Sequence, residues 1–421
     1  MSTSFANHPC FNAEARHRFG RVHLPVAPDC NVQCNFCDRK TDCINESRPG
    51  VTSVVLSPGQ AVTYLRGLLE RRPDISVVGI AGPGDPFADA ELTMETLRRV
   101  HAEFPDKLLC VATNGLGIGP HVAELAQLGV SHVTVTINAV DPEIGAKVYA
   151  WVRDGRRVLR GVEGARLILE RQTAAVKALA EAGITVKINS IIIPGLNDQH
   201  IEAVANFVRG LGAGIMNCIP LIPAPGSAFA EVPAPDGKLI EQVRKVAGEV
   251  LPQMSHCSRC RADACGLLNE GTEPVAITAL QDAARLPLNP EEHRPHVAVA
   301  SREGLLVNQH LGEATHLLIY GMHEGIPGLL DERLTPEPGS GMARWSMLAD
   351  LLKDCHSVLV SGVGPSPRRI LERSGLKVIQ TEGLIEESLS FALHNKAIPA
   401  SLQKRFAGCG KECKGTGQGC G

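Results

Sequence analysis

Apolar and polar positions over residues 20–250 alternate between two patterns: short runs rich in β-branched residues, and longer stretches with apolar residues at helical spacing. This alternation is typical of parallel strands joined by crossover helices. The predicted strands are residues 21–26, 76–81, 108–112, 132–137, 185–193 and 214–222. The predicted helices are residues 58–72, 91–104, 121–128, 164–182, 198–211 and 236–251. About six β/α units are fewer than the eight of a closed TIM barrel, so the pattern predicts an α/β fold with a partial, open (βα)6 TIM-like barrel.

A second alternating pattern begins near residue 296. Strands at 296–300, 316–320, 357–361 and 377–380, with helices at 344–352, 367–374 and 385–395, predict a second, smaller α/β domain. Between the two patterns, Pro274, Pro287, Pro290 and Pro295 stand amid polar residues, which favours a linker. The predicted organisation is a barrel domain with cluster-binding extensions over residues 1–270, a linker over 271–295, a compact domain over 296–400 and a flexible Cys- and Gly-rich tail over 401–421.

Composition limits the partners and the compartment. The chain has 421 residues and a formal net charge of −3, and it lacks the strongly basic patch that nucleic acid binding requires. Residues 1–20 lack the apolar core of a signal peptide, and no apolar run is long enough to span a bilayer. We therefore expect a cytoplasmic protein without nucleic acid or membrane partners, whose 14 cysteines are reduced and serve as metal ligands or catalytic groups.

Three cysteines, Cys30, Cys34 and Cys37, follow the first predicted strand directly. Thiolates are the usual ligands of iron–sulfur clusters. Three of them at this spacing suit one cubane cluster and leave its fourth iron free to bind a substrate. The alternative is a zinc knuckle, but a structural zinc site needs a fourth ligand and typically has two separate Cys-x2-Cys pairs. Active-site groups of such barrels gather at the carboxyl ends of the strands, which is where the triad is predicted to lie.

The triad spacing, with the aromatic Phe36 before the last cysteine, resembles that of the radical S-adenosylmethionine (SAM) superfamily. The resemblance implies that the free iron chelates the amino and carboxylate groups of SAM, and that an electron from the reduced cluster cleaves SAM to a 5′-deoxyadenosyl radical. Cys30, Cys34 and Cys37 would then be the catalytic residues and the ligands of a 4Fe-4S cluster.

Glycines or polar residues also follow the later strands. The glycines after the second strand allow close backbone approach to a ligand, and residues 81–86 resemble the glycine-rich motif of the superfamily that binds the SAM amino group, with Asp85 where glutamate is commoner. A lone Thr-Asn-Gly is most often a turn, but successive strand ends with such groups favour a ligand site. The residues expected to bind SAM are Gly82, Gly84, Asn114, Thr136 and Ile188.

Outside the triad, the chain has more metal-ligating residues than one cluster needs: Cys10, His23, Cys43, Cys110, Cys257 and Cys260. A neutral imidazole is a competent metal ligand, although a histidine flanked by apolar residues, as His23 is, more often belongs to a core. Spacing shows only a surplus of ligands and does not sort them into sets. Cys218 and Cys265 have no predicted role.

These positions resemble the NifB family of nitrogenase cofactor maturases. The resemblance is carried by residues 28–40 and 257–264, and it extends over residues 8–270. It implies that two further 4Fe-4S clusters are fused, with a SAM-derived carbide and an added sulfur, into an eight-iron precursor of the nitrogenase cofactor. In this family pattern, one substrate cluster would be held by His23, Cys43 and Cys110, and the other by Cys10, Cys257 and Cys260.

The family resemblance also implies partners: SAM, an iron–sulfur cluster donor, an electron donor, and the cofactor-carrier or scaffold proteins of nitrogenase assembly. Residues 307–314 resemble the NifX-type, ribonuclease H-like domain that binds iron–molybdenum cofactor precursors. The second domain would then hold or pass on the product cluster, with His310 as a candidate contact. The alternative is an attached domain that only stabilises the barrel.

Two other classes of protein stay open at this stage. A different radical SAM enzyme, such as the cyclase of molybdopterin synthesis, also combines an N-terminal triad with C-terminal cysteines, but it would not need His23, Cys43 and Cys110. A non-enzymatic iron–sulfur carrier would bind clusters but would not cleave SAM.

Overall fold

The computed structural model describes residues 8–11, 14–45, 51–254, 257, 260–268, 270–339 and 341–403. The chain divides into two compact units, Met1–Gln281 and Asp282–Gly421. The division falls within the predicted linker, where the structure has a helix, α8 (Pro274–Arg285). The cysteines of the predicted tail lie outside the described residues.

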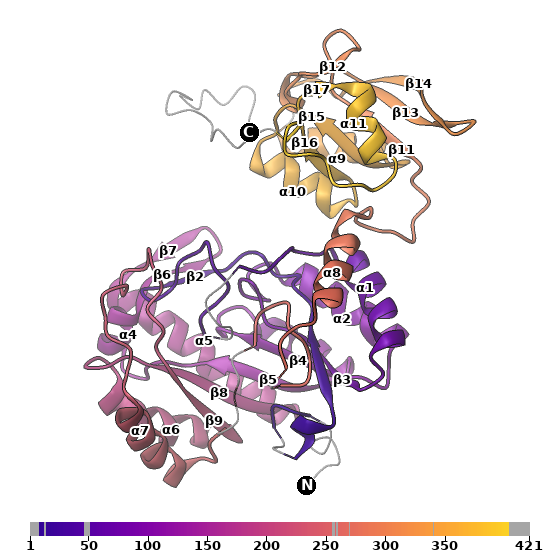
Figure 1. Ribbon diagram of the computed structural model, residues 1–421. Coiled ribbons are helices and arrows are strands. Elements are labelled where there is room, and N and C mark those ends of the chain that lie inside the picture. Colours follow the sequence, from indigo (N-terminus) through magenta and orange to yellow (C-terminus); the bar gives the residue numbers. More distant parts are fainter. Residues whose placement is uncertain are drawn as a thin grey trace. The chain divides into compact units, whose positions relative to one another are not determined.

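The first unit is built on a seven-stranded sheet with the order β10-β1-β3-β4-β5-β8-β9 (Figure 1). Its parallel strands are β1 (Gly20–His23), β3 (Ile75–Ile80), β4 (Leu108–Thr113), β5 (Val130–Thr136), β8 (Thr185–Ile192) and β9 (Ile215–Pro220). The short strand β10 (Cys265–Gly266) pairs antiparallel with β1 at the edge. The sheet does not close on itself, so the predicted open (βα)6 barrel is confirmed.

From β1 to β9, the strands of this sheet lie in the same order as in the chain. Because crossovers between parallel strands are right-handed, strands that are always added on one side place their helices on one face. These helices are α1 (Pro58–Arg71), α2 (Ala90–Glu103), α3 (Val122–Gln127), α5 (Gly161–Glu181), α6 (Ile201–Gly210) and, after β9, α7 (Gly237–Val250). Figure 1 shows α1, α2, α6 and α7 outside the sheet. The inner face of the sheet is therefore not covered by these helices.

Local signals explain where these helices begin. Ser57 and Gln60 form a reciprocal capping box, with Pro58 at the first position of α1. Asp236 accepts a hydrogen bond from the Leu239 N–H at the start of α7. Strong caps of this kind are readable in the sequence, and the predicted bounds of both helices lie within a residue of the observed ones.

A small sheet that the sequence does not predict lies at the triad. Strand β2 (Val32–Cys34) pairs antiparallel with β6 (Tyr149–Asp154), which also pairs with β7 (Arg157–Leu159). Helix α4 (Pro142–Val148) leads into β6. A strand as short as β2 shows no visible alternation. The backbone around Cys34 is therefore fixed by a ladder rather than left as a loop.

The second unit has a five-stranded sheet with the order β14-β13-β11-β15-β16. Strands β11 (His296–Val299), β15 (Cys355–Val360) and β16 (Lys377–Gln380) are parallel, whereas β13 (His316–His323) and β14 (Ile326–Leu334) form an antiparallel hairpin. Strands β12 (Leu306–Val307) and β17 (Gly383–Leu384) make a separate pair. The sequence does not predict β14, most of whose residues are exposed, because no buried face marks it.

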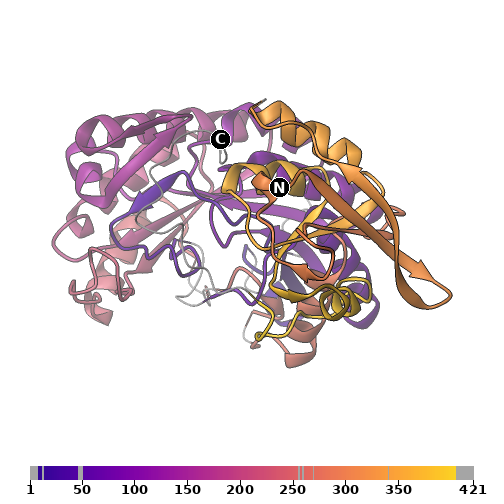
Figure 2. The same ribbon diagram turned by 90° about the horizontal axis from the view of Figure 1, so that it is seen from above.

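Helices cover both faces of this second sheet (Figure 2). Helices α9 (Met342–Leu351) and α10 (Pro365–Arg373) share a core with Val358, whereas α11 (Ile385–Ala392) packs against Leu359 on the opposite face. The predicted smaller α/β domain is confirmed. Among the helices of the described residues, none has both the length and the apolar character that crossing a bilayer requires.

Trp345 of α9 should dominate the stability of the second unit. Its side chain is 2% exposed and packs in the apolar core with Leu348 and Val358. Trp345→Ala should lower the free energy of unfolding of this unit by about 3–5 kcal/mol through cavity formation. Met347→Ala on the same helix, where 47% of the residue is exposed, should change it by less than about 0.5 kcal/mol. Denaturation of the full chain, followed by circular dichroism, measures both; equal losses would contradict the packing described.

Candidate active site: a cysteine triad and a cysteine- and histidine-lined pocket

The loop after β3 holds the segment that carries the triad. The Gly84 N–H donates to the Ala27 carbonyl (2.6 Å) and the Asp85 N–H to the Asp29 carbonyl (2.7 Å), so the two segments run backbone to backbone. A Cβ at Gly84 would collide with the Asp29 carbonyl oxygen, and Gly82 has a φ of +145°, which favours glycine. Both glycines therefore shape the triad segment, whatever they contribute to ligand binding.

The three triad thiols share one environment. Cys34 is buried, and Cys30 and Cys37 are half-buried against an apolar cluster that includes Phe36 and Ile44. Burial, followed by the neighbouring thiols of Cys37 and Cys30, raises the pKa of Cys34 well above its usual value. The three sulfurs thus lie close enough to influence one another, as ligands of one cluster must. Iron binding would replace their protons.

A chain of buried amides connects the triad to residues deeper in the barrel. Asn45 Nδ2 lies 3.9 Å from Cys34 Sγ, Asn189 Nδ2 donates to the Asn45 carbonyl (3.1 Å), and Asn217 Nδ2 donates to Asn189 Oδ1 (3.3 Å). Amide N–H groups directed at cluster sulfurs are one of the means by which proteins tune reduction potentials. The amide chain therefore gives the triad a defined polar contact on its inner side.

Asp85 has a structural task in this arrangement. Its buried carboxylate accepts hydrogen bonds from the backbone N–H groups of Phe87 (2.9 Å) and Asn114 (2.6 Å) and from the Thr113 hydroxyl (3.0 Å). Burial raises its pKa. These bonds engage both carboxylate oxygens, so Asp85 fixes the loop after β4.

The other residues expected to bind SAM occupy different surroundings. Asn114 lies at the triad, with its Nδ2 3.8 Å from Cys30 Sγ. Gln172 donates to the carbonyl oxygens of Asn114 (2.9 Å) and Thr136 (2.8 Å), which ties these two strand ends together. Ile188 is fully buried, and since strand neighbours alternate in direction, its side chain faces away from the pocket that the flanking residues line. The SAM contact of Ile188 stays a prediction.

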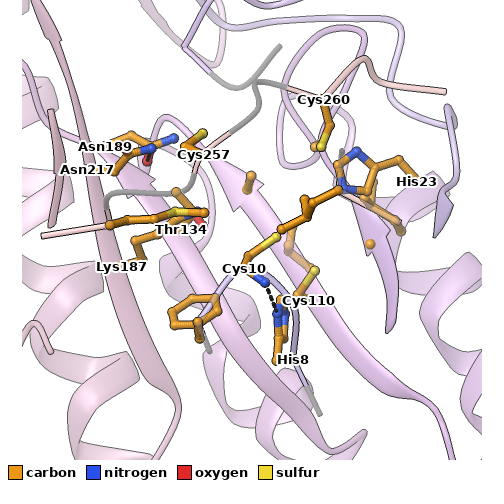
Figure 3. A pocket seen from close by; sticks show the side chains of 18 of the residues that line it. His8, Cys10, His23, Cys110, Thr134, Lys187, Asn189, Asn217, Cys257 and Cys260 are labelled. Atoms are coloured by element: carbon orange, nitrogen blue, oxygen red, sulfur yellow. Dashed lines mark hydrogen bonds between the residues drawn. The ribbon is translucent and has the colours of Figure 1, made fainter. Parts of the chain in front are cut away.

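A pocket on the inner side of the barrel gathers most of the remaining candidate ligands (Figure 3). It encloses about 660 Å³ of space, its open mouth included. The candidate ligands that line it are Cys10, His23, Cys110, Cys257 and Cys260. They come from the N-terminal segment, β1, β4 and the segment after α7, so the fold brings together residues from both ends of the first unit.

His23 has the geometry of a metal-binding histidine. Its Nδ1 lies 3.1 Å from the Arg261 carbonyl oxygen, and because a carbonyl only accepts, Nδ1 carries the proton and the lone pair of Nε2 is left for a ligand. Such a carbonyl contact fixes the ring of many metal-bound histidines. Burial, aided by the charge of Arg21, lowers the pKa of His23 to about 4. The imidazole is therefore neutral near pH 7 and able to bind iron.

Gly79 separates His23 from Cys110. His23 of β1 pairs with Gly79 of β3, which pairs with Cys110 of β4. A Cβ at Gly79 would lie 3.0 Å from both Cys110 Sγ and His23 Cδ2. The absence of a side chain at Gly79 therefore lets the imidazole and the thiol lie close together over this strand.

Cys10, Cys257 and Cys260 form a second group. Burial raises the pKa of Cys10 to about 12, the charges of Lys187 and Arg21 oppose this rise, and the nearby thiols of Cys260 and Cys257 add to it. Arg21 Nη2 and Nε lie 3.1 and 3.3 Å from Cys260 Sγ. Its guanidinium thus lies directly against the sulfur of a candidate ligand.

The remaining cysteines lie elsewhere. Cys43 is not among the described residues that line the pocket, and its N–H donates to the Pro83 carbonyl (2.9 Å) beside the loop after β3. Cys218 and Cys265 are buried in strands β9 and β10. Within the described residues, no three His, Cys, Asp or Glu side chains are close enough to hold a single metal ion. Cluster ligands bind different irons and stand farther apart.

Several polar residues of the pocket were not assigned a role from the sequence: His8, Thr134, Lys187, Asn189 and Asn217. A signal exists for two of them, because Lys187 and Asn189 stand at alternate positions of an otherwise apolar strand. Buried parallel strands are normally apolar on both faces, so such an alternation marks a functional face. His8 lies outside any predicted element, and no pattern indicates it.

Comparisons with known proteins identify both units. Residues 24–208 match the family model of the radical SAM superfamily. Residues 294–394 match the model described as dinitrogenase iron-molybdenum cofactor, the family to which NifX-like domains belong. The first match implies a 4Fe-4S cluster and SAM as cofactors.

Full-length relatives share this arrangement. The FeMo cofactor biosynthesis protein NifB of Chlorobaculum tepidum is 50% identical over 423 residues, which cover 100% of both chains. The protein of the same name from Klebsiella pneumoniae is 41% identical over 88% of this chain and 86% of its own. Among solved structures, methylornithine synthase (PylB) aligns with 15% identity and a TM-score of 0.34 over 57% of this chain and 72% of that chain, too remote to add to the argument. The chain therefore belongs to the NifB family and is a radical SAM enzyme of FeMo cofactor biosynthesis.

Proposed function

We propose that this enzyme fuses two 4Fe-4S clusters, with a carbide derived from SAM and an added sulfur, into an eight-iron precursor of the FeMo cofactor. The observation that carries the proposal is the pocket, which gathers four thiols and two imidazoles and is joined to the triad through Asn189 and Asn45. Soft thiolate ligands select iron–sulfur clusters. An enzyme with a small organic substrate would have no use for so many of them.

The ligands divide into two sets in this proposal. His23 and Cys110, on either side of Gly79, hold one substrate cluster together with Cys43. The other cluster is held by Cys10, Cys257 and Cys260, whose thiols act on one another. The contact of Cys43 with the loop after β3 puts this cysteine on the triad side of the first set.

The triad and the strand ends are assigned to SAM. When bound, the cofactors supply a methyl group for the carbide carbon and a 5′-deoxyadenosyl radical that removes hydrogen from it. Cys30, Cys34 and Cys37 hold the catalytic cluster, and the apolar side chains packed on them exclude water. We assign SAM binding to Gly82, Gly84, Asn114, Thr136 and Ile188, the last through its backbone, because its buried side chain faces away from the pocket.

A substrate cluster that must leave the protein is best held by few protein ligands of mixed type. A structural cluster is retained by a full set of thiolates, whereas a product has to detach from its ligands. An imidazole held by one carbonyl contact, as at His23, is a neutral ligand that can be exchanged at less electrostatic cost than a thiolate. Incomplete ligation of the substrate clusters therefore favours release.

We assign the second unit to holding or passing on the product cluster. His310 Nδ1 accepts a hydrogen bond from the Gly312 N–H (3.1 Å), so Nε2 carries the proton and can donate to a cluster sulfide. The partners of this proposal are an iron–sulfur cluster donor, an electron donor and the carrier or scaffold proteins of nitrogenase assembly.

The direct test is to trace the methyl carbon of SAM into the product. The full chain, loaded anaerobically with iron and sulfide and reduced with dithionite, is given SAM with a labelled methyl carbon. We expect 5′-deoxyadenosine, together with an extractable iron–sulfur product that contains the label. A cluster carrier would form no 5′-deoxyadenosine. Cleavage of SAM without labelled carbon in an iron–sulfur product would contradict carbide insertion and leave another radical SAM reaction.

Cys34→Ala should abolish SAM cleavage, because only the triad holds the catalytic cluster. The measurement is 5′-deoxyadenosine formation with dithionite. Cys218→Ala is the matched control: Cys218 is equally buried but has no assigned ligand role, so cleavage should persist. Normal cleavage by Cys34→Ala would disprove the assignment of the triad.

His23→Ala should remove a nitrogen ligand from one substrate cluster without unfolding the barrel. Pulsed paramagnetic resonance should show nitrogen hyperfine coupling in the unchanged protein and none in the variant, while the triad cluster still binds SAM. Gly79→Ala should weaken the same signal, because its methyl group would press against His23 and Cys110 and displace their side chains.

The control for the glycine variant is Gly67→Ala, which lies on helix α1 with no neighbouring atom within 4 Å of the new Cβ. It should leave the nitrogen coupling intact. A merely structural His23 would instead cost about 1–3 kcal/mol of stability, with unchanged cluster spectra per folded molecule, and that result would remove His23 from the ligand set.

A further inference from the structure

Lys187 is a buried cation in the wall of the pocket (Figure 3). It belongs to β8 and is 8% exposed. Its Nζ lies 3.9 Å from Met254 Sδ and 5.4 Å from the centroid of the Phe11 ring. Burial of an ammonium group is costly unless negative charge is close to it. Negative charge bound in this pocket would therefore stabilise the ammonium group of Lys187.

Thiolates are the source of negative charge that the pocket offers. The described residues that line it include no Asp or Glu. The two residues that Lys187 Nζ approaches, Phe11 and Met254, lie directly after Cys10 and three positions before Cys257. Arg21 Nη2 lies 3.1 Å from Cys260 Sγ. Two cations therefore lie beside the same group of thiols.

We propose that Lys187 is the charge-balancing residue of the substrate cluster held by Cys10, Cys257 and Cys260, and that its ammonium keeps this cluster in the pocket until it reacts. The inference rests on the proposed function, since it takes that cluster as a substrate. Three thiolates on an oxidised 4Fe-4S core leave a net negative charge. The set that includes the neutral imidazole of His23 has a smaller negative charge. The two cations would therefore stabilise the all-thiolate set more.

The residue type fits this task. Arg21 presents a rigid fork that is already engaged with Cys260 Sγ and the Leu267 carbonyl oxygen. Lysine instead carries a compact charge with rotatable donors on a flexible stem. Such a charge can follow the sulfides of a cluster whose shape changes during fusion, without the directional constraint of a guanidinium. Lys187 is therefore a positioning residue for the substrate.

The test uses Lys187→Met in the full chain, because methionine keeps much of the length and apolar bulk while removing the charge. After anaerobic reconstitution, the variant should retain the triad cluster and its spectral response to SAM but lose the iron of one 4Fe-4S cluster per chain. Any remaining substrate cluster of this set should have a more negative midpoint potential, because a nearby positive charge favours the reduced form. Lys187→Arg should restore both properties in large part.

Lys177→Met on the exposed face of α5 is the matched control and should change neither iron content nor potential. Iron content and midpoint potentials equal to those of the unchanged protein in Lys187→Met would overturn the proposal and leave Lys187 as a packing residue. Loss of all clusters in both Lys187→Met and Lys187→Arg would also overturn the proposal. Arginine keeps the positive charge, so this result would show that the charge does not decide whether the cluster is retained. If the unchanged protein itself held only the triad cluster, the proposed function would fail instead.

Discussion

The register between β1, β3 and β4 is the constraint on which the candidate site depends. His23, Gly79 and Cys110 lie in one row across these strands because parallel backbone ladders hold them there. A shift of one residue in either ladder would turn the imidazole or the thiol to the opposite face of the sheet. The aliphatic residues that alternate with them, such as Val22 and Val78, are buried and specify the register. Apolar packing on one face thus sets the positions of the candidate ligands on the other.

Burying polar groups inside the barrel costs free energy unless they form hydrogen bonds. The structure supplies these hydrogen bonds from different partners. Asp85 is satisfied by backbone and hydroxyl donors, and Asn189 links the side chain of Asn217 to the backbone of Asn45. Each of these side chains has more than one hydrogen-bond partner and so holds a strand end or a loop in place. Buried amides and carboxylates with several partners are rigid, which suits a site whose candidate ligands must be held in fixed positions.

The sequence was sufficient for the strand order and for the triad, because both are local signals: β-branched runs, capping residues such as Ser57 and closely spaced cysteines. It could not show which distant residues share a pocket, since the approach of Cys10 to Cys257 depends on how the two ends of the unit fold back over the sheet. The strand β2 was missed because three residues show no period, and Asp85 was assigned to a ligand motif although its hydrogen bonds go to the chain itself. Lys187 was visible as an anomaly in a buried strand, but its meaning depends on neighbours that only the fold supplies.

The edge strand β10 has a consequence for the order in which the protein is completed during synthesis. All the parallel strands and the triad precede residue 221, whereas Cys257, Cys260 and β10, which pairs with β1, come after α7. A ribosome must therefore release the chain well beyond Gly266 before the pocket has its full wall. The nascent barrel passes through a stage with a complete triad and an incomplete pocket, so the triad becomes available to the iron–sulfur supply of the cell before the pocket is complete.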